Sequence, residues 1–382
     1  MRAPNRWAML SLGVAAQGAG CVFMFGLPFL IPLLRDRLDL TLAQAGVIVG
    51  APSAGMLLTL IAWGWLADRY GERLAMALGL GLATVFLVCA AFTTTPGPLA
   101  VLLALAGASG ASANAASGRV VLGWFPAERR GVAMGWRQTA QPIGVAVAGA
   151  VLPSMGGLRE ALLLMAGICL VTGIAVVSMM VDPPRGPAKP GERTDSPYKG
   201  STGLWRIHVA SMLLVVPQFA TATFALTYLV AERQWNPATA GQLVAVAQFA
   251  GAGGRLLCGR WSDWARSRLR PMRRLAVLNA SVMVLLAVAV HMGSAVGTPL
   301  LIVALVISMS GNGLAFTAVS EMAGPAWAGR ALGGQNTVQN IAAATTPAVL
   351  GALITHTGFG AAFGLAGALA LVAAFATPSD AT

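Results

Sequence analysis

Three arginines lie inside long apolar stretches of the chain, where a cation needs a partner. They are Arg119, Arg137 and Arg255. A charged side chain within a membrane-spanning stretch is costly and usually faces a cavity, another charge or a transported solute. Arg119 and Arg137 each lie about six residues from the end of their stretch, which at helical rise is roughly 9 Å. With no carboxylate expected nearby, an anion would neutralise these guanidinium groups.

Polar side chains accompany the arginines at matched positions. Arg137, Gln138 and Gln141 align with Gln335, Asn336 and Gln339. Spacings of three and four residues keep each set on one helix face, so that both sets can line a cavity. We predict that these six residues, Arg255 and Arg119 contact the solute. Two alternatives stay open: hydrogen bonding between helices for the amides, and bracing of an inner gate for Arg119 and Arg255.

Acidic residues are scarce in the same stretches. Of 13 acidic residues, only Glu321 falls within one, near its end. Cation exporters that exchange protons usually need a buried carboxylate, so this distribution favours an anionic solute. The sequence contains no HExxH, no CxxC and no nucleotide-binding glycine loop, and we expect no enzymatic activity, no cofactor and no metal.

A charged loop sequence occurs twice. Residues 64–73, GWLADRYGER, match residues 259–268, GRWSDWARSR, at Gly64/Gly259, Asp68/Asp263 and Arg73/Arg268. Residues 131–141 match residues 329–339 in the same way. Duplicated halves are typical of secondary transporters, which move one half against the other around a central site.

The composition requires the elements that position these residues to span a membrane. The chain has 382 residues, 57% hydrophobic and 10% charged, which is too little charge for a water-facing surface. Each span needs about 20 apolar residues and has to be helical. The expected spans are 8–34, 42–66, 74–94, 98–125, 131–154, 158–181, 205–230, 237–260, 274–293, 298–323, 330–355 and 358–377. Thr41 with Gln44, and Asn236 with Pro237, mark two helix starts.

One polar stretch, 182–203, is rich in proline, glycine and charge, and is typical of a linker. We therefore expect an N-terminal six-helix half at 1–181, a cytoplasmic linker at 182–203 and a C-terminal six-helix half at 204–382. The net charge is +12. The Lys and Arg residues of the chain concentrate in loops on the same side of the membrane as the N-terminus, which predicts that both termini are cytoplasmic.

The repeated loop resembles a motif of the major facilitator superfamily, whose architecture is twelve spans in two halves. In that family the motif forms a cytoplasmic latch. The resemblance implies a gating role for Gly64, Asp68, Arg69, Gly71 and Arg73, and for Gly259 and Asp263 in the second copy. The alternative is that these are only cytoplasmic loop charges. Arg266 replaces the second glycine of the first copy, so we expect the second loop to turn differently.

Two further stretches resemble anion carriers of this superfamily. Residues 254–263 are similar to the eighth span of oxalate/formate and monocarboxylate transporters, in which an arginine meets the substrate carboxylate. Residues 118–135 resemble part of cyanate and nitrate permeases. The resemblance of residues 254–263 implies that Arg255 likewise binds a substrate carboxylate.

These observations predict an all-α polytopic membrane protein that transports a small, carboxylate-like anion by alternating access. We expect a monomer in a bacterial-type inner membrane. Its partners would be the solute, lipid, and a proton or counter-solute for coupling, with no nucleic acid. The alternatives are a multidrug or metabolite efflux antiporter of the same superfamily and, from another class, a membrane enzyme or signalling protein.

Overall fold

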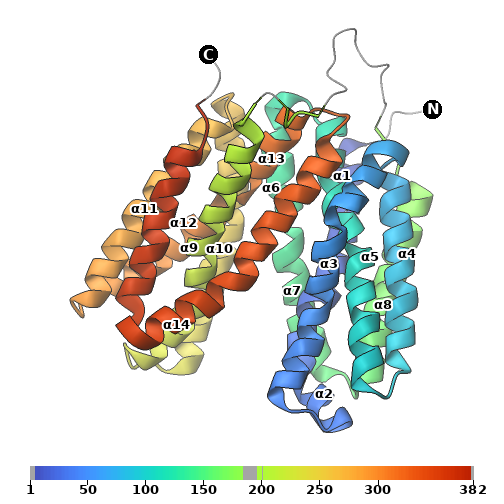
Figure 1. Ribbon diagram of the computed structural model, residues 1–382, viewed down its shortest axis with the longest axis horizontal. Coiled ribbons are helices and arrows are strands. Elements are labelled where there is room, and N and C mark those ends of the chain that lie inside the picture. Colours follow the sequence, from blue (N-terminus) through green and yellow to red (C-terminus); the bar gives the residue numbers. More distant parts are fainter. Residues whose placement is uncertain (1–4, 184–195, 200, 380–382) are drawn as a thin grey trace. The chain divides into compact units, whose positions relative to one another are not determined.

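The computed structural model describes residues 5–183, 196–199 and 201–379, which contain helices and no strand (Figure 1). The first part of the chain forms α1 (Arg6–Gly26), η1 (Leu27–Leu30), α2 (Ile31–Leu38), α3 (Leu42–Tyr70), α4 (Glu72–Ala91), α5 (Pro96–Trp124), η2 (Ala127–Arg129), α6 (Arg130–Gln138), α7 (Ala140–Val151), η3 (Leu152–Ser154) and α8 (Leu158–Met179). The second part forms α9 (Gly203–Ala231), α10 (Pro237–Trp264), α11 (Leu269–His291), α12 (Gly297–Ser310), α13 (Asn312–Ala323) and α14 (Ala328–Ala376).

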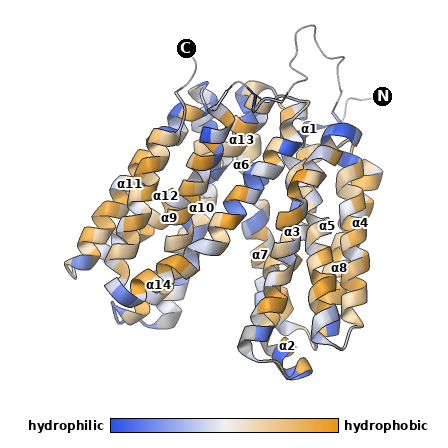
Figure 2. Ribbon diagram, viewed as in Figure 1, coloured by the Kyte–Doolittle hydropathy of each residue, from blue (hydrophilic) through white to orange (hydrophobic). Residues whose placement is uncertain are grey.

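Every one of the twelve expected spans is helical. Among the described residues, nine helical segments are long and apolar enough to cross a membrane. The difference has three local causes. The fifth span is divided at Thr139 into α6 and α7, α10 is interrupted by polar residues such as Gln248 and Arg255, and α14 contains two spans joined at Gly358, whose φ is 82°. Figure 2 shows apolar residues along most of each helix and polar residues near many ends.

Both predicted helix starts are confirmed. The Thr41 backbone N–H donates to Gln44 Oε1 at 3.0 Å, and the Gln44 N–H donates to Thr41 Oγ1 at 3.3 Å, which is the reciprocal capping box. At the start of α10, the Thr239 N–H donates to Asn236 Oδ1 at 3.4 Å. These bonds satisfy backbone donors that have no partner inside the helix.

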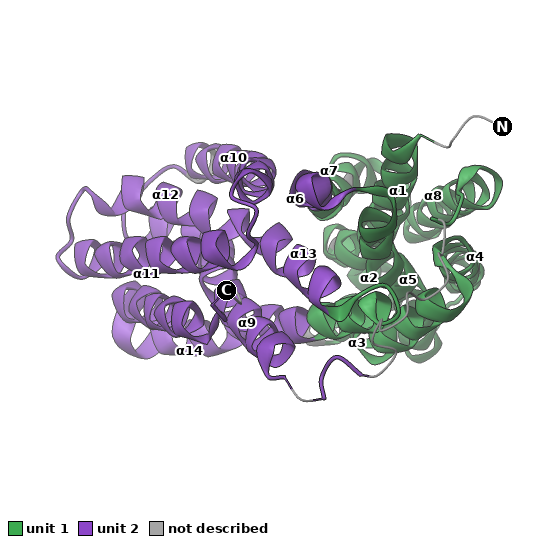
Figure 3. Ribbon diagram, turned by 90° about the horizontal axis from the view of Figure 1, so that it is seen from above, with its two compact units in different colours: residues 1–125, 136–194, 323–337 green, residues 126–135, 195–322, 338–382 purple. Residues whose placement is uncertain are grey.

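By contacts, the chain forms two compact units (Figure 3). Unit 1 contains residues 1–125, 136–194 and 323–337, and unit 2 contains residues 126–135, 195–322 and 338–382. Each unit therefore includes a short segment from the other part of the sequence. The halves at 1–181 and 204–382 stay a prediction, and residues 184–195 and 200 of the predicted linker lie outside the described residues.

Small residues allow close helix packing inside unit 1. The small-residue run of α5 is buried, and α5 packs along α3. A Cβ added at Gly55 would lie 1.9 Å from the Ala104 carbonyl oxygen, and one at Gly107 would lie 2.0 Å from the Pro52 carbonyl oxygen. Glycine is therefore required at this crossing, which brings Arg119 of α5 beside the end of α3.

Candidate functional site: buried arginines and two carboxylate latches

Arg119 lies in a buried ion-pair cluster of unit 1. Its Nε donates to Glu72 Oε1 at 2.7 Å, its Nη1 donates to Asp68 Oδ1, and Nη1 also donates to the Pro325 carbonyl oxygen at 2.7 Å. Asp68 lies in the last turn of α3, and Glu72 is the first residue of α4 and is buried. The expectation that Arg119 has no carboxylate nearby is therefore wrong. Two carboxylates already balance its charge, which favours the gate-bracing alternative.

Asp68 also caps the first turn of α14. Its carboxylate accepts the backbone N–H groups of Gly329 at 2.7 Å and Arg330 at 3.0 Å, and the Arg330 Nε at 3.0 Å. The free N–H groups and partial positive charge of a helix N-terminus make it a favourable partner for a carboxylate. Gly64 permits the approach, because a Cβ there would lie 2.2 Å from the Gly329 carbonyl oxygen.

The second copy of the motif repeats this arrangement inside unit 2. Asp263 accepts the backbone N–H groups of Gly131 at 2.8 Å and Val132 at 2.9 Å, at the start of α6. A Cβ on Gly259 would lie 2.3 Å from the Gly131 carbonyl oxygen. Both aspartates thus cap a helix that begins with the second repeated sequence. The matched glycines mark the two places where the backbones meet.

Arg268 joins this second latch to α13. It donates to Asp263 Oδ1 at 2.6 Å and to both Glu321 oxygens at 3.2 Å, while Arg130 lies 3.5 Å from Glu321. Burial alone would lower the pKa of Arg268, but hydrogen bonds and charges from Glu321 and Asp263 outweigh burial and raise it. Arg268 therefore stays a cation, and Glu321 belongs to this latch.

Two other motif residues, Arg69 and Arg73, have different surroundings. Arg69 Nε donates to the Tyr70 hydroxyl at 3.2 Å. The Arg73 backbone N–H donates to Asp182 at 2.8 Å, and its side chain donates to the Val177 carbonyl. Arg73 thus holds the end of α8, whereas its match Arg268 holds the second aspartate.

The turn between α3 and α4 passes through Gly71, with φ 107° and ψ 160°. The matched Arg266 also has a positive φ, 49°. Both loops therefore turn through a positive φ, at different angles. An arginine is strained in this conformation, whereas glycine is not.

Arg137 is completely buried in unit 1, at the end of α6. Its Nε donates to Ser117 Oγ at 2.8 Å, its Nη2 to the Asn114 carbonyl oxygen at 2.6 Å and its Nη1 to Gln138 Oε1 at 3.1 Å. Ser117 in turn donates to Gln17 Oε1 at 3.1 Å. These contacts join α1, α5 and α6 through neutral oxygens, in contrast to the carboxylates around Arg119.

Arg255 is buried in unit 2, and its Nε donates to the Met309 carbonyl oxygen at 3.0 Å. Gln339 of α14 donates to Ser211 of α9, and Asn312 donates to Gln218 at 2.9 Å. Unit 2 therefore contains one predicted arginine and one predicted amide, Gln339, among buried polar contacts from α9, α12 and α13.

The remaining predicted amides have different surroundings. Gln335 is completely buried, Gln141 is half-buried, and Asn336 Nδ2 donates to the Leu332 carbonyl of its own helix at 2.9 Å. Sequence reasoning missed four residues that organise these contacts: Glu72, Ser117, Arg330 and Arg268 as an aspartate partner. Glu72 had a signal, since it directly follows the motif glycine, but its loop position suggested exposure.

Known proteins are similar to this chain in sequence and in architecture. The Major Facilitator Superfamily profile matches residues 13–347. The uncharacterized MFS-type transporter Rv2994 of Mycobacterium tuberculosis is 41% identical over 372 residues, which cover 96% of this chain and 84% of that protein. The probable galactarate/D-glucarate transporter GudP of Bacillus subtilis is 24% identical, covering 89% of this chain and 84% of its own length.

A solved structure of FucP, a Major Facilitator Superfamily transporter in the outward conformation, superposes with a TM-score of 0.72 at 17% identity. The match covers 97% of this chain and 99% of that one. It shows a common fold. The chain belongs to the Major Facilitator Superfamily and is a multi-pass membrane transporter of small molecules, not an enzyme.

Proposed function

We propose that this transporter moves a small organic anion of the carboxylate class by alternating access, with Arg137 and Arg255 as binding charges. The observation that supports this most is the environment of Arg137. It is completely buried, and the hydrogen bonds described above go to Ser117, Asn114 and Gln138, which are neutral. A carboxylate that reaches Arg137 would form a charge-assisted hydrogen bond with its guanidinium group.

The relatives support the same class of solute. Galactarate and D-glucarate, named for GudP, are small dicarboxylates. Arg255 is buried as well, and its Nε donates to the Met309 carbonyl oxygen at 3.0 Å; in this proposal its positive charge binds a carboxylate of the solute. Gln138 and Gln339, together with Gln141, Gln335 and Asn336, then orient the solute through amide groups.

The two aspartate clusters serve as cytoplasmic latches in this proposal. Asp68 holds the first turn of α14, and Asp263 holds the first turn of α6. Alternating access requires these helix starts to be released and bound again in each cycle. Both termini are then cytoplasmic, in a bacterial inner membrane, and a proton or a counter-solute provides coupling.

Thermal stability of the purified protein tests solute binding. D-glucarate, galactarate, nitrate and cyanate at millimolar concentrations are compared, and we expect a dicarboxylate to raise the Tm. Arg137→Gln and Arg255→Gln should each raise the dicarboxylate concentration needed for half of the maximal Tm increase at least tenfold. Arg159→Gln, which removes an exposed arginine at the start of α8, is the control and should respond like the wild type. Stabilisation by lipophilic cations, with none by anions, would refute the proposal.

A further inference from the structure

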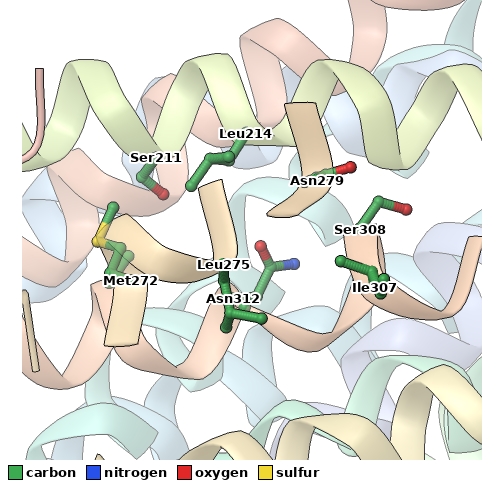
Figure 4. A pocket seen from close by; sticks show the side chains of 10 residues that line it. Ser211, Leu214, Met272, Leu275, Asn279, Ile307, Ser308 and Asn312 are labelled. Atoms are coloured by element: carbon green, nitrogen blue, oxygen red, sulfur yellow. The ribbon is translucent and has the colours of Figure 1, made fainter. Parts of the chain in front are cut away.

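A cavity of about 20 Å³ lies inside unit 2, beside the break between α12 and α13. Figure 4 shows apolar side chains such as Leu214, Met272 and Leu275 around it. Four polar side chains also line it: Ser211, Asn279, Ser308 and Asn312. A void of this size admits about one water molecule, which needs two to four polar partners.

Asn279 is the least satisfied of these side chains. It is only 3% exposed on α11, and its Oδ1 meets no hydrogen-bond donor among the described residues. A buried amide oxygen without a donor is costly, and a neighbouring cavity is where a donor can be placed. The orientation of an amide is interchangeable, so either of its polar atoms can face the cavity.

The other polar side chains connect the cavity to three more helices. Asn312 Nδ2 donates to Gln218 at 2.9 Å, which leaves its own Oδ1 as an acceptor. Ser308 Oγ lies 3.2 Å from Thr221 Oγ1 on α9. A water molecule in the cavity would therefore join α11 to α9, α12 and α13 with two or more hydrogen bonds.

This position matters because of what lies between Ser308 and Asn312. Met309 is in the last turn of α12, where carbonyl groups have no partner inside the helix, and its oxygen accepts Arg255 Nε at 3.0 Å. A contact that fixes the α12–α13 break also fixes the acceptor of Arg255.

We propose that the cavity binds one ordered water molecule, and that Asn279 is a positioning residue that acts on Arg255 through this water and the α12–α13 break. The lining groups are neutral and the guanidinium of Arg255 is bonded to the adjacent residue, so the site favours water over a cation. The effect on Arg255 rests on the proposed function, whereas the water site does not.

The first test is a structure of the full-length wild type at a resolution that shows ordered waters. We expect density in the cavity within hydrogen-bond distance of Asn279 and at least one of Ser211, Ser308 and Asn312. Asn279→Leu, which replaces the amide with an apolar group of similar size, should remove this density and keep the wild-type Tm. Absence of the density in the wild type would overturn the water site.

The second test measures affinity for D-glucarate. Asn279→Leu should raise its Kd several-fold at unchanged Tm, and Asn279→Ser, which keeps a polar group and leaves room for a second water, should restore most of the affinity. Ser281→Ala is the control, since Ser281 is exposed on α11 and bonds to the Val277 carbonyl of its own helix. Wild-type affinity in Asn279→Leu would overturn the positioning role.

Ion replacement separates water from a cation. NaCl and choline chloride are compared at equal ionic strength, and we expect the same Tm in both. A rise of Tm specific to Na⁺ that Asn279→Leu abolishes would assign the cavity to a cation and overturn the proposal. If the wild type binds none of the tested anions, the proposed function fails, while the density still decides the water site.

Discussion

Three arginines in apolar surroundings differ in their acceptors. Arg119 lies between Asp68 and Glu72, whereas the hydrogen bonds shown for Arg137 and Arg255 go to neutral oxygens. All three positions were predictable from the sequence, because charge is rare in these stretches. The partners of Arg119 were not, since Asp68 and Glu72 are 51 and 47 residues away along the chain. Only the crossing of α3, α4 and α5 brings them together.

The substitution Asp68→Asn tests the first latch, which Asp68 forms with the start of α14. Asparagine keeps the shape but removes the charge that faces Arg119, Arg330 and the first turn of α14. We expect amide hydrogen exchange at Gly329 and Arg330 to become about tenfold faster or more, as the loss of charge-assisted bonds of 1–3 kcal/mol implies. Exchange is measured by mass spectrometry on peptides that cover residues 323–337.

The second aspartate provides the matched control. Asp263→Asn should accelerate exchange at Gly131 and Val132 and leave Gly329 at the wild-type rate, because in the described part of the chain Asp263 bonds to the start of α6 and Asp68 to the start of α14. Equal acceleration at both helix starts in either variant would show that the latches are not local contacts.

At the level of elements, glycine determines where helices can cross. A Cβ on Gly333 of α14 would lie 2.5 Å from the Leu60 carbonyl oxygen of α3, whereas one on Gly334 would meet no atom within 4 Å. Neighbouring glycines on one helix thus have different roles. Gly333 is required by contact, and Gly334 is not.

This contrast makes a stability prediction. Gly333→Ala should lower the stability by about 1–3 kcal/mol, because its Cβ overlaps backbone that cannot move aside. Gly334→Ala should be neutral or raise the stability by up to about 1 kcal/mol, since alanine favours the helix. The Tm of each purified variant decides this, and equal losses in both would contradict the close approach of α14 to α3.

The sequence predicted most helices because their signals are local. Thr41 with Gln44 placed the start of α3, and the predicted span 98–125 ends next to the last residue of α5, Trp124. The division at Thr139 was not predicted, whereas the break at Gly358 inside α14 lies at the predicted boundary between the spans 330–355 and 358–377. The partners of Arg73 were not predictable either, because Val177 and Asp182 lie 104 and 109 residues away along the chain and are brought close by the packing of α8 against α4.

For the whole molecule, the distribution of Lys and Arg predicts that the C-terminus is cytoplasmic. Ser379→Cys tests this in a Cys89→Ser background, because Cys89 is exposed whereas Cys21, Cys169 and Cys258 are buried. A membrane-impermeant maleimide should label the variant in inside-out vesicles and not in intact spheroplasts. Labelling in spheroplasts alone would reverse the predicted orientation.

In the proposed function, this member of the superfamily transports an organic anion that binds to Arg137 and Arg255. The most direct measurement is uptake of radiolabelled D-glucarate into proteoliposomes that contain the purified protein, with exchange against unlabelled D-glucarate inside. We predict saturable uptake that falls at least tenfold in Arg137→Gln and in Arg255→Gln and is unchanged in Arg159→Gln. The proposal would be contradicted if the protein took up no D-glucarate or other carboxylate but transported a lipophilic cation saturably, at a rate that Arg137→Gln does not change.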